Sequence, residues 1–223
     1  MKIIVTGSKG LIGTEITRYL KSRSHKVIEC DLVLGHDLSN EKFVRQWFSE
    51  NKAEAIVNLF ALDDKMDSTR EKTTLFNISL DTFRDYMEIN LTCLFSVCRE
   101  FARNNKKGAI VNFSSTYGIT APNPGLYNGS HKHIGYPVSK AGVIMMTKYL
   151  ATHLAPKIRV NCLAPAGVKH KQGKEFIKEY SKMVPMGRMM QTGELNKIVE
   201  YLCSDASSFV TGSVFTIDGG WTA

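Results

Sequence analysis

Short apolar runs alternate with amphipathic segments along most of the chain. A short, β-branched apolar run is typical of a buried strand, and such runs lie at residues 2–6, 27–31, 55–59, 109–114, 158–163 and 214–217. Apolar residues at helical spacing predict helices at residues 11–21, 41–49, 79–103, 137–153, 174–183 and 194–204. Because strands that alternate with helices form parallel sheets, we expect an α/β fold, a doubly wound parallel sheet in a single domain over residues 1–223.

One connection in this pattern is short. Only five residues separate Asp31, at the end of the second predicted strand, from Asp37. A helical crossover between parallel strands takes about a dozen residues or more. We therefore expect that the helix after the second strand is missing and that the next strand is a stub.

Composition narrows the class of protein. A chain of 223 residues, 43% hydrophobic and 22% charged, is long enough to bury one substantial core. No apolar stretch approaches the roughly 18 residues of a membrane span, and the start lacks the pattern of a signal peptide, so we expect a cytoplasmic protein with no membrane partner. The scattered cysteines are expected to be buried, reduced thiols, namely Cys30, Cys93, Cys98, Cys162 and Cys203.

The formal net charge of +8 favours an anionic small molecule as partner. Lysine and arginine are spread over every segment, and the chain shows no aromatic-interleaved basic run or nucleic-acid motif, so we expect no nucleic acid. His131 and His133 form an H-x-H pair without cysteine or carboxylate partners at metal-site spacing, so we expect no metal.

The stretch TGSKGLIG lies between the first predicted strand and the first predicted helix. Glycines there allow a tight turn and close approach of a pyrophosphate, and the helix N-terminus attracts the phosphate charge. The spacing G-x-x-G-x-x-G departs from G-x-G-x-x-G, and a glycine-rich turn without a ligand is the alternative. We expect the loop to bind a dinucleotide through Gly7, Ser8, Lys9, Gly10, Leu11, Ile12 and Gly13.

Asp31 stands where a carboxylate can accept hydrogen bonds from both hydroxyls of an adenosine ribose. An acid at this position repels a 2'-phosphate and favours NAD over NADP. Lys9 acts in the opposite direction, because its cation could pair with that phosphate, so NADP is not excluded. The alternative for Asp31 is a solvated residue at a strand end.

Tyr136 precedes a proline, and Lys140 follows four positions later. Proline disfavours helical geometry in the residue before it, so we expect Pro137 at the first helical position and Tyr136 at the cap. Residues four apart share a helix face, so the Lys140 ammonium can lie near the phenol and lower its pKa from about 10. Tyr136 is then a candidate general acid/base, and a surface pair of tyrosine and lysine is the alternative.

Further motifs accompany this pair in a fixed order, namely NLFA, INLTCLFSV, GAIVNFSSTYG, YPVSK, IRVNCLAPAGV and FVTGSVFTIDGGW. Together with TGSKGLIG, they resemble the short-chain dehydrogenase/reductase family over nearly the whole chain. The resemblance implies a Rossmann fold and an oxidoreductase that moves a hydride between NAD(H) and a secondary alcohol or ketone.

The resemblance also implies roles for individual residues. Tyr136 would be the acid/base, and Lys140 would bind the nicotinamide ribose while lowering the pKa of the tyrosine. Ser115 would hold the reacting oxygen, and Asn90 would anchor a water for proton relay. Without the resemblance, the alternative for Ser115 is a cap at a strand end, and the alternative for Asn90 is an ordinary polar residue of a helix.

More distant parts of the cofactor site follow from the same resemblance. Asp37 and Leu38 would lie beside the adenine ring. Asn58 and Ala61 belong to a stretch that matches the family's NNAG with two departures. The backbone amide of Val168 would meet the nicotinamide carboxamide.

Two loops, residues 116–135 and residues 167–190, are expected to determine the substrate. Residues 167–182 carry five lysines against two glutamates, and His131 and Lys132 lie in the other loop. These charges favour an anionic substrate, with a solvated basic surface as the alternative.

The loop sequences and the ending IDGGWTA resemble family members from bacterial surface-sugar and flagellin-modification pathways. That resemblance implies a sugar phosphate or nucleotide-linked sugar as substrate, with Tyr127 as a candidate contact.

In relatives the helix matching residues 137–153 packs against a partner subunit, so we expect a homodimer or homotetramer. Two other functions remain open: a catalytically silent NAD(P)-sensing or regulatory protein, and an epimerase or dehydratase that recycles its NAD.

Overall fold

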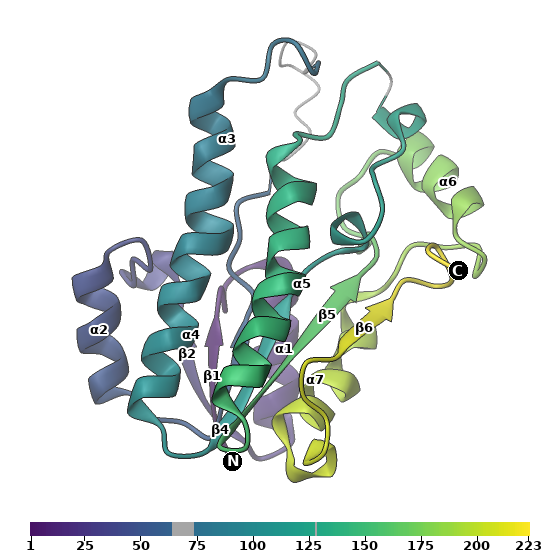
Figure 1. Ribbon diagram of the computed structural model, residues 1–223. Helices are drawn as coiled ribbons and strands as arrows, with labels where there is room; N and C mark the ends of the chain where they lie inside the picture. The colour runs from purple at the N-terminus through teal and green to yellow at the C-terminus, as the bar shows by residue number, and fades with distance from the viewer. Residues whose placement is uncertain (64–73, 128) are drawn as a thin grey trace.

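The structure is a computed structural model that describes residues 1–63, 74–127 and 129–223. In this part of the chain, six parallel strands form one sheet in the order β2-β1-β3-β4-β5-β6. The strands are β1 (Lys2–Thr6), β2 (Lys26–Cys30), β3 (Ala55–Asn58), β4 (Gly108–Phe113), β5 (Ile158–Pro165) and β6 (Val214–Ile217). The strand order changes direction at β1, so the sheet is doubly wound, as the sequence predicts (Figure 1).

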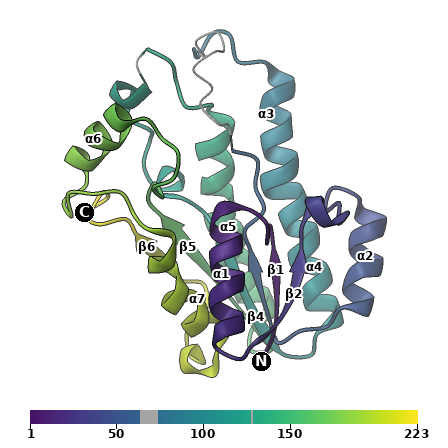
Figure 2. The same cartoon turned by 180° about the vertical axis from the view of Figure 1, so that it is seen from behind.

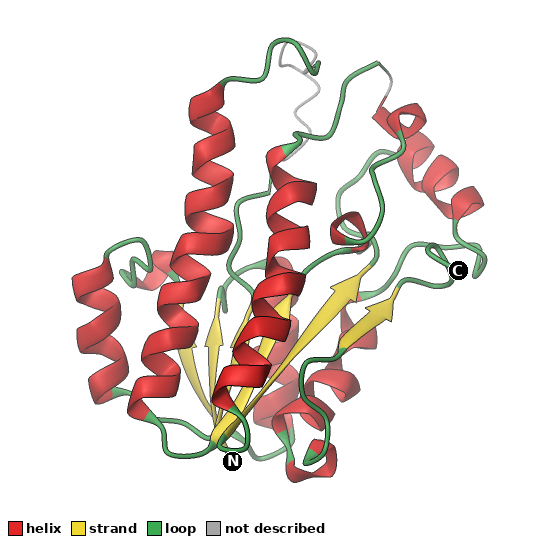
Figure 3. Ribbon diagram, in the orientation of Figure 1, coloured by secondary structure: helices red, strands yellow, loops and turns green. Residues whose placement is uncertain are grey.

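Helices cover both faces of this sheet (Figure 1, Figure 2). They are α1 (Leu11–Ser22), α2 (Glu41–Glu50), α3 (Leu80–Met87), α4 (Cys93–Asn104), α5 (Gly135–Leu154), α6 (Lys174–Met183) and α7 (Asn196–Cys203). Side chains of α2, α4 and α5 pack with Ile4 on one face, whereas side chains of α1 and α7 pack with Ile3 and Val5 on the other. The longer loops lie beyond the carboxyl ends of the strands (Figure 3).

Burial on both faces explains the apolar runs in the sequence. Ile3, Ile4 and Val5 occupy consecutive positions of β1 and are all fully buried, because neighbouring side chains of a strand point to opposite faces. The five cysteines are buried thiols, as predicted. Every helix among the described residues is too short or too polar to cross a bilayer.

The connection after β2 is partly as predicted. A single 3₁₀ turn (Leu32–Leu34) takes the place of the missing crossover helix, and Asp31 caps it by accepting a hydrogen bond from the Val33 amide at 3.0 Å. The predicted stub strand is wrong, because the described chain forms no strand between β2 and α2. Instead, Leu38 is buried in the core, and the Asp37 carboxylate accepts a hydrogen bond from the Ser39 amide at 2.9 Å.

The helix predicted over residues 79–103 is interrupted in the structure. Ser79 caps it by accepting a hydrogen bond from the Thr82 amide at 3.0 Å, and a π-helical turn (Glu88–Thr92) separates α3 from α4. A π turn adds one residue to the helical repeat and often marks a functional position. Here it contains Asn90, which is 2% exposed.

Candidate active site

The predicted site residues come from different segments but lie at one edge of the sheet. Gly7 follows β1, Asn58 ends β3, Ser115 follows β4 and Val168 follows β5. These are the carboxyl ends of parallel neighbouring strands, next to the point where the strand order changes direction. In open α/β sheets this edge is where ligands bind.

The glycine loop, residues 6–13, is constrained by backbone packing. Gly7 has φ +65°, and a Cβ at this position would lie 2.5 Å from the Phe60 nitrogen. A Cβ at residue 13 would lie 2.0 Å from the Gly7 carbonyl oxygen. Because both clashes involve main-chain atoms, no side-chain movement can relieve them, and the loop requires glycine at both positions.

The same loop has the properties of an anion site. Gly10 precedes α1 without a capping side chain, and the first turn of α1 contains no acidic residue. Among the described residues, the buried hydroxyl of Ser8 has no hydrogen-bond partner. Leu11 is 42% exposed, so the start of α1 is accessible. A buried hydroxyl and helix amides without acceptors fit a phosphate group.

Asp31 connects the glycine loop to the end of β2. One carboxylate oxygen accepts a hydrogen bond from the Lys9 amide at 2.8 Å, and the other accepts from Val33. The ammonium of Lys9 forms an ion pair with Glu29, which also pairs with Lys21 at 2.6 Å. The cation of Lys9 therefore already has an acidic partner on β2.

Asn58 ends β3, as expected, and its side chain forms hydrogen bonds within the sheet. Its side chain is 3% exposed and donates a hydrogen bond to the Asn112 carbonyl oxygen at 2.9 Å. It also accepts from Thr6 at 3.1 Å, while Asn112 donates to Thr147 at 3.1 Å. These buried hydrogen bonds link β1, β3, β4 and α5. The Asn58 side chain therefore stabilises the sheet and its contact with α5. Ala61 is exposed at the same edge.

The start of α5 corrects one prediction. The helix begins at Gly135, so Tyr136 is its second residue and not its cap. Its amide donates to the His133 carbonyl at 3.0 Å, which continues the turn before the helix. Pro137 is tolerated in the first turn because amides there have no intrahelical acceptor.

Tyr136, Ser115 and Lys140, which we call the acid/base cluster, lie together. The Ser115 hydroxyl lies near the Tyr136 phenol, and its hydrogen-bonding influence acts to lower the pKa of the phenol. The Lys140 nitrogen is 5.6 Å from the centroid of the Tyr136 ring and donates a hydrogen bond to the Phe113 carbonyl at 3.1 Å. The structure thus brings these three predicted residues into one group.

Burial determines the ionisation of this cluster. Burial raises the pKa of Tyr136, and the charge of Asp63 acts in the same direction. Burial lowers the pKa of Lys140 to about 8 from 10.5. The prediction that the tyrosine pKa is lowered is therefore wrong for this geometry, because desolvation of a phenolate outweighs the attraction of one cation.

Asn90 lies beside the cluster and joins two segments. Its carbonyl oxygen accepts from the Leu62 amide at 2.7 Å, and its amide group donates to the Leu62 carbonyl at 3.1 Å. The amide group also donates to the Ser139 hydroxyl at 2.9 Å, and that hydroxyl donates to the Tyr136 carbonyl at 2.8 Å. Asn90 thus fixes the segment after β3 against α5. No motif in the sequence indicates a role for Ser139.

The two predicted substrate loops pack on each other, apart from residue 128, which lies outside the described residues. Tyr127 is 4% exposed and donates a hydrogen bond to the Tyr117 hydroxyl at 2.9 Å. Tyr180 on α6 accepts from the Gly167 amide at 2.6 Å and stacks on Trp221 at 4.6 Å between ring centroids. The aromatic contacts of Tyr117, Tyr180 and Trp221 were not predicted, because the segments that carry them are far apart in sequence.

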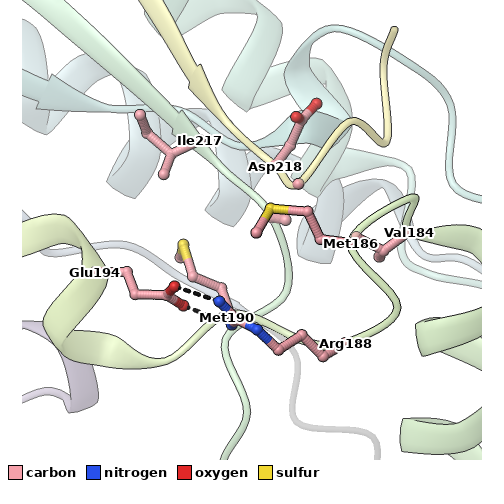
Figure 4. A pocket seen from close by; sticks show the side chains of 9 residues that line it. Val184, Met186, Arg188, Met190, Glu194, Ile217 and Asp218 are labelled. Carbon is pink, nitrogen blue, oxygen red and sulfur yellow. Dashed lines mark hydrogen bonds and ion pairs between the residues drawn. The ribbon is translucent and has the colours of Figure 1, made fainter.

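A small pocket of about 80 Å³ lies next to the loop of residues 167–190 (Figure 4). It is lined by apolar side chains, by Asp218 and by the ion pair of Arg188 and Glu194, whose closest atoms are 2.6 Å apart. The Arg188 guanidinium lowers the pKa of Glu194 to about 2. Neither Tyr136 nor Ser115 lines this pocket, so it is separate from the acid/base cluster.

Comparison with known proteins assigns the chain to a family. Residues 9–222 match the family model described as enoyl-(acyl carrier protein) reductase. A 3-oxoacyl-(acyl-carrier-protein) reductase from Aquifex aeolicus is 30% identical over 98% of this chain and 86% of its own length. The chain belongs to the short-chain dehydrogenase/reductase family. The resemblance of the sequence to this family is thereby confirmed, and the protein is an oxidoreductase of this type.

Two further relatives extend the comparison. The crystal structure of a short-chain dehydrogenase from Leptospira borgpetersenii with bound NAD+ has a TM-score of 0.88 and 29% identity, over 100% of this chain and 92% of that chain. An uncharacterized short-chain type dehydrogenase/reductase from Sinorhizobium fredii is 31% identical over 98% of this chain. The chain spans 43% of the length of that relative.

Proposed function

We propose that this short-chain dehydrogenase/reductase interconverts a secondary alcohol and a ketone with NAD(H). The observation that carries the proposal is the acid/base cluster, in which the Ser115 hydroxyl acts on the Tyr136 phenol and the Lys140 nitrogen lies 5.6 Å from the centroid of the Tyr136 ring. The cluster shares the carboxyl edge of the sheet with a glycine loop that fits a phosphate group.

The glycine loop and the start of α1 would hold the pyrophosphate. Asp31 would accept the hydroxyls of the adenosine ribose, since each carboxylate oxygen that accepts one amide retains a further acceptor site. Lys140 would bind the nicotinamide ribose, and Val168 would meet the carboxamide. The bound NAD+ of the Leptospira relative supports this assignment.

When bound, NAD supplies the acceptor or donor of the hydride. In oxidation, the phenolate of Tyr136 takes the hydroxyl proton of the alcohol, and in reduction the phenol donates a proton to the ketone oxygen. The Ser115 hydroxyl donates a hydrogen bond to the reacting oxygen. Asn90 acts as a positioning residue, because its side chain forms hydrogen bonds with Leu62 and Ser139. Its side-chain carbonyl oxygen also retains one acceptor site for a water.

The substrate is proposed to be anionic, a sugar phosphate or a nucleotide-linked sugar. Three lysines on the outer surface of α6, Lys174, Lys178 and Lys182, are exposed and support this choice. Tyr127 would act through its hydrogen bond to Tyr117, since it is itself buried. A 3-oxoacyl thioester is the second candidate, favoured by the Aquifex relative.

The protein is further proposed to form a homodimer or homotetramer through α5. Val138, Met145 and Tyr149 on this helix are exposed by 43%, 64% and 58%. Apolar side chains in one row on a helix are typical of a contact between subunits.

The test is a turnover assay with NAD(H) and NADP(H) on sugar phosphates, nucleotide sugars, simple secondary alcohols and 3-oxoacyl thioesters. Net formation or consumption of NADH supports the proposal. Product without any net change in NADH would indicate an epimerase or dehydratase. NAD binding without turnover of any class would indicate a sensing protein, and preference for simple alcohols over sugars would contradict the proposed substrate.

A further inference from the structure

We propose that Lys132 and Asp63 act as a pair that sets the charge at Tyr136, with Lys132 as a second cation for the acid/base. The inference rests on the proposed function, in which Tyr136 exchanges a proton with the substrate. It assigns a positioning role to two residues outside the acid/base cluster.

Lys132 lies very close to the tyrosine ring. Its nitrogen is 4.5 Å from the centroid of the Tyr136 ring, closer than the nitrogen of Lys140 at 5.6 Å. The Lys132 side chain is only 10% exposed, so water screens its charge weakly. An ammonium in this position attracts the electrons of the ring and favours a phenolate over a phenol.

Asp63 is the counter-ion of this lysine. It lies in the segment after β3, and its carboxylate forms an ion pair with Lys132. The carboxylate is 55% exposed, whereas the lysine is nearly buried. Its negative charge raises the pKa of both Tyr136 and Lys140. Asp63 thus opposes the phenolate that Lys132 favours.

The other groups that face Tyr136 belong to three elements. Lys140 lies on α5 with it, Ser115 and Tyr117 follow β4, and Tyr86 on α3 stacks on His133 at 4.6 Å between ring centroids. The Ser115 hydrogen bond lowers the pKa of Tyr136, while the two tyrosines raise it. None of these groups is altered by a substitution at Lys132 or Asp63, so such variants change the charge of the pair alone.

Replacing either residue of the pair should change the pKa of Tyr136, and the two replacements should change it in opposite directions. Without the Asp63 charge, the carboxylate no longer disfavours the phenolate, and the pKa of Tyr136 should fall. Without the Lys132 charge, the ammonium no longer favours the phenolate, and the pKa of Tyr136 should rise. A role in folding alone would destabilise both variants and would not move the tyrosine pKa in opposite directions.

The experiment is a pH titration of the full chain with tyrosine labelled by carbon-13 at Cζ, followed by NMR with and without NAD. The Tyr136 signal is the one missing from Tyr136→Phe among the eight tyrosines. We expect Asp63→Asn to titrate about one pH unit below the wild type and Lys132→Met to titrate above it. Lys132→Arg, which keeps the charge, should titrate like the wild type.

The matched controls are Asp81→Asn and Arg84→Met, which remove an exposed ion pair of 2.6 Å on α3 and should leave the Tyr136 titration unchanged. The proposal is overturned if the pKa of Tyr136 is the same in Asp63→Asn and in the wild type. It is also overturned if Tyr136 titrates in neither protein below the pH of alkaline unfolding. The titration can be measured without substrate turnover. Failure of this proposal is therefore distinct from failure of the proposed function, which would appear as absence of NADH formation. In an active enzyme, the acidic limb of kcat/KM for oxidation should move in the same directions.

Discussion

The glycine loop and the acid/base cluster lie at the same edge of the sheet but are constrained by different forces. In the loop, main-chain atoms lie so close together that a single Cβ at residue 13 would be 2.0 Å from a carbonyl oxygen. In the cluster, the controlling quantities are burial and charge, which place the pKa of Lys140 at about 8 and raise that of Tyr136.

This difference predicts how each region responds to change. Steric constraints on a backbone are nearly all-or-none, because a clash of main-chain atoms cannot be relieved locally. Electrostatic constraints are graded, because charges at several positions add to one potential. The loop should therefore fail on single substitutions, whereas the cluster should shift its pH dependence.

Gly13→Ala should give the largest effect on the loop. The added methyl group forces α1 away from Gly7, so we expect a loss of about 3 kcal/mol in unfolding free energy and about 100-fold weaker NAD binding. Urea unfolding and calorimetry measure the two quantities. Gly173→Ala is the matched control, because its Cβ would meet nothing within 4 Å. Equal NAD binding by both variants would show that the loop is not the cofactor site.

Lys140→Met tests the acid/base cluster, because it should lower turnover and raise the stability of the fold. Turnover should fall by about 100-fold because the cation beside Tyr136 is lost. At pH 7 the variant should be more stable than the wild type by about 2 kcal/mol, since the folded wild type must hold a buried charge.

The pH dependence of this difference follows from the lowered pKa of Lys140. Between pH 8 and 10.5 the unfolded chain binds more protons at this lysine, so the stability of the wild type rises with pH. The advantage of Lys140→Met should disappear above pH 10.5. Thermal unfolding over this range measures it, and a variant that is less stable at pH 7 would contradict the account.

Glu29→Gln should give a smaller effect, on the choice of cofactor. The substitution releases the Lys9 ammonium from its ion pair, so NADP should bind about fivefold more tightly while NAD binding stays the same. Adding Lys9→Met should abolish the gain, and Lys21→Met alone should not produce it. Titration of both cofactors at low and high salt measures the effect, and an unchanged preference would exclude Lys9 as a phosphate contact.

Features carried by short segments could be predicted from the sequence. The predicted ranges 174–183 and 214–217 coincide with α6 and β6, because local periodicity and β-branching determine these elements. The glycine loop was found for the same reason. The stub strand was wrong because Leu38 is buried in the core instead of pairing at the sheet edge.

Features that depend on contacts between distant segments could not be predicted. The pair of Lys132 and Asp63 joins two loops 69 positions apart, and no pattern in either loop indicates the other. The spacing of Tyr136 and Lys140 indicated an acid/base or a surface pair, and the family resemblance favoured the acid/base. Ser115 was found through the family resemblance alone. The position of Tyr136 inside α5 was missed because the turn from His133 continues into the helix.

The most direct measurement of the central claim is hydride transfer by Tyr136→Phe, alongside NAD binding by the same sample. The substitution removes one hydroxyl and leaves the ring that packs beside Lys132 and Lys140. We expect a rate lower by about 1,000-fold with an unchanged Kd for NAD, because the proton donor and acceptor is lost. A rate equal to that of the wild type would show that another group carries the proton.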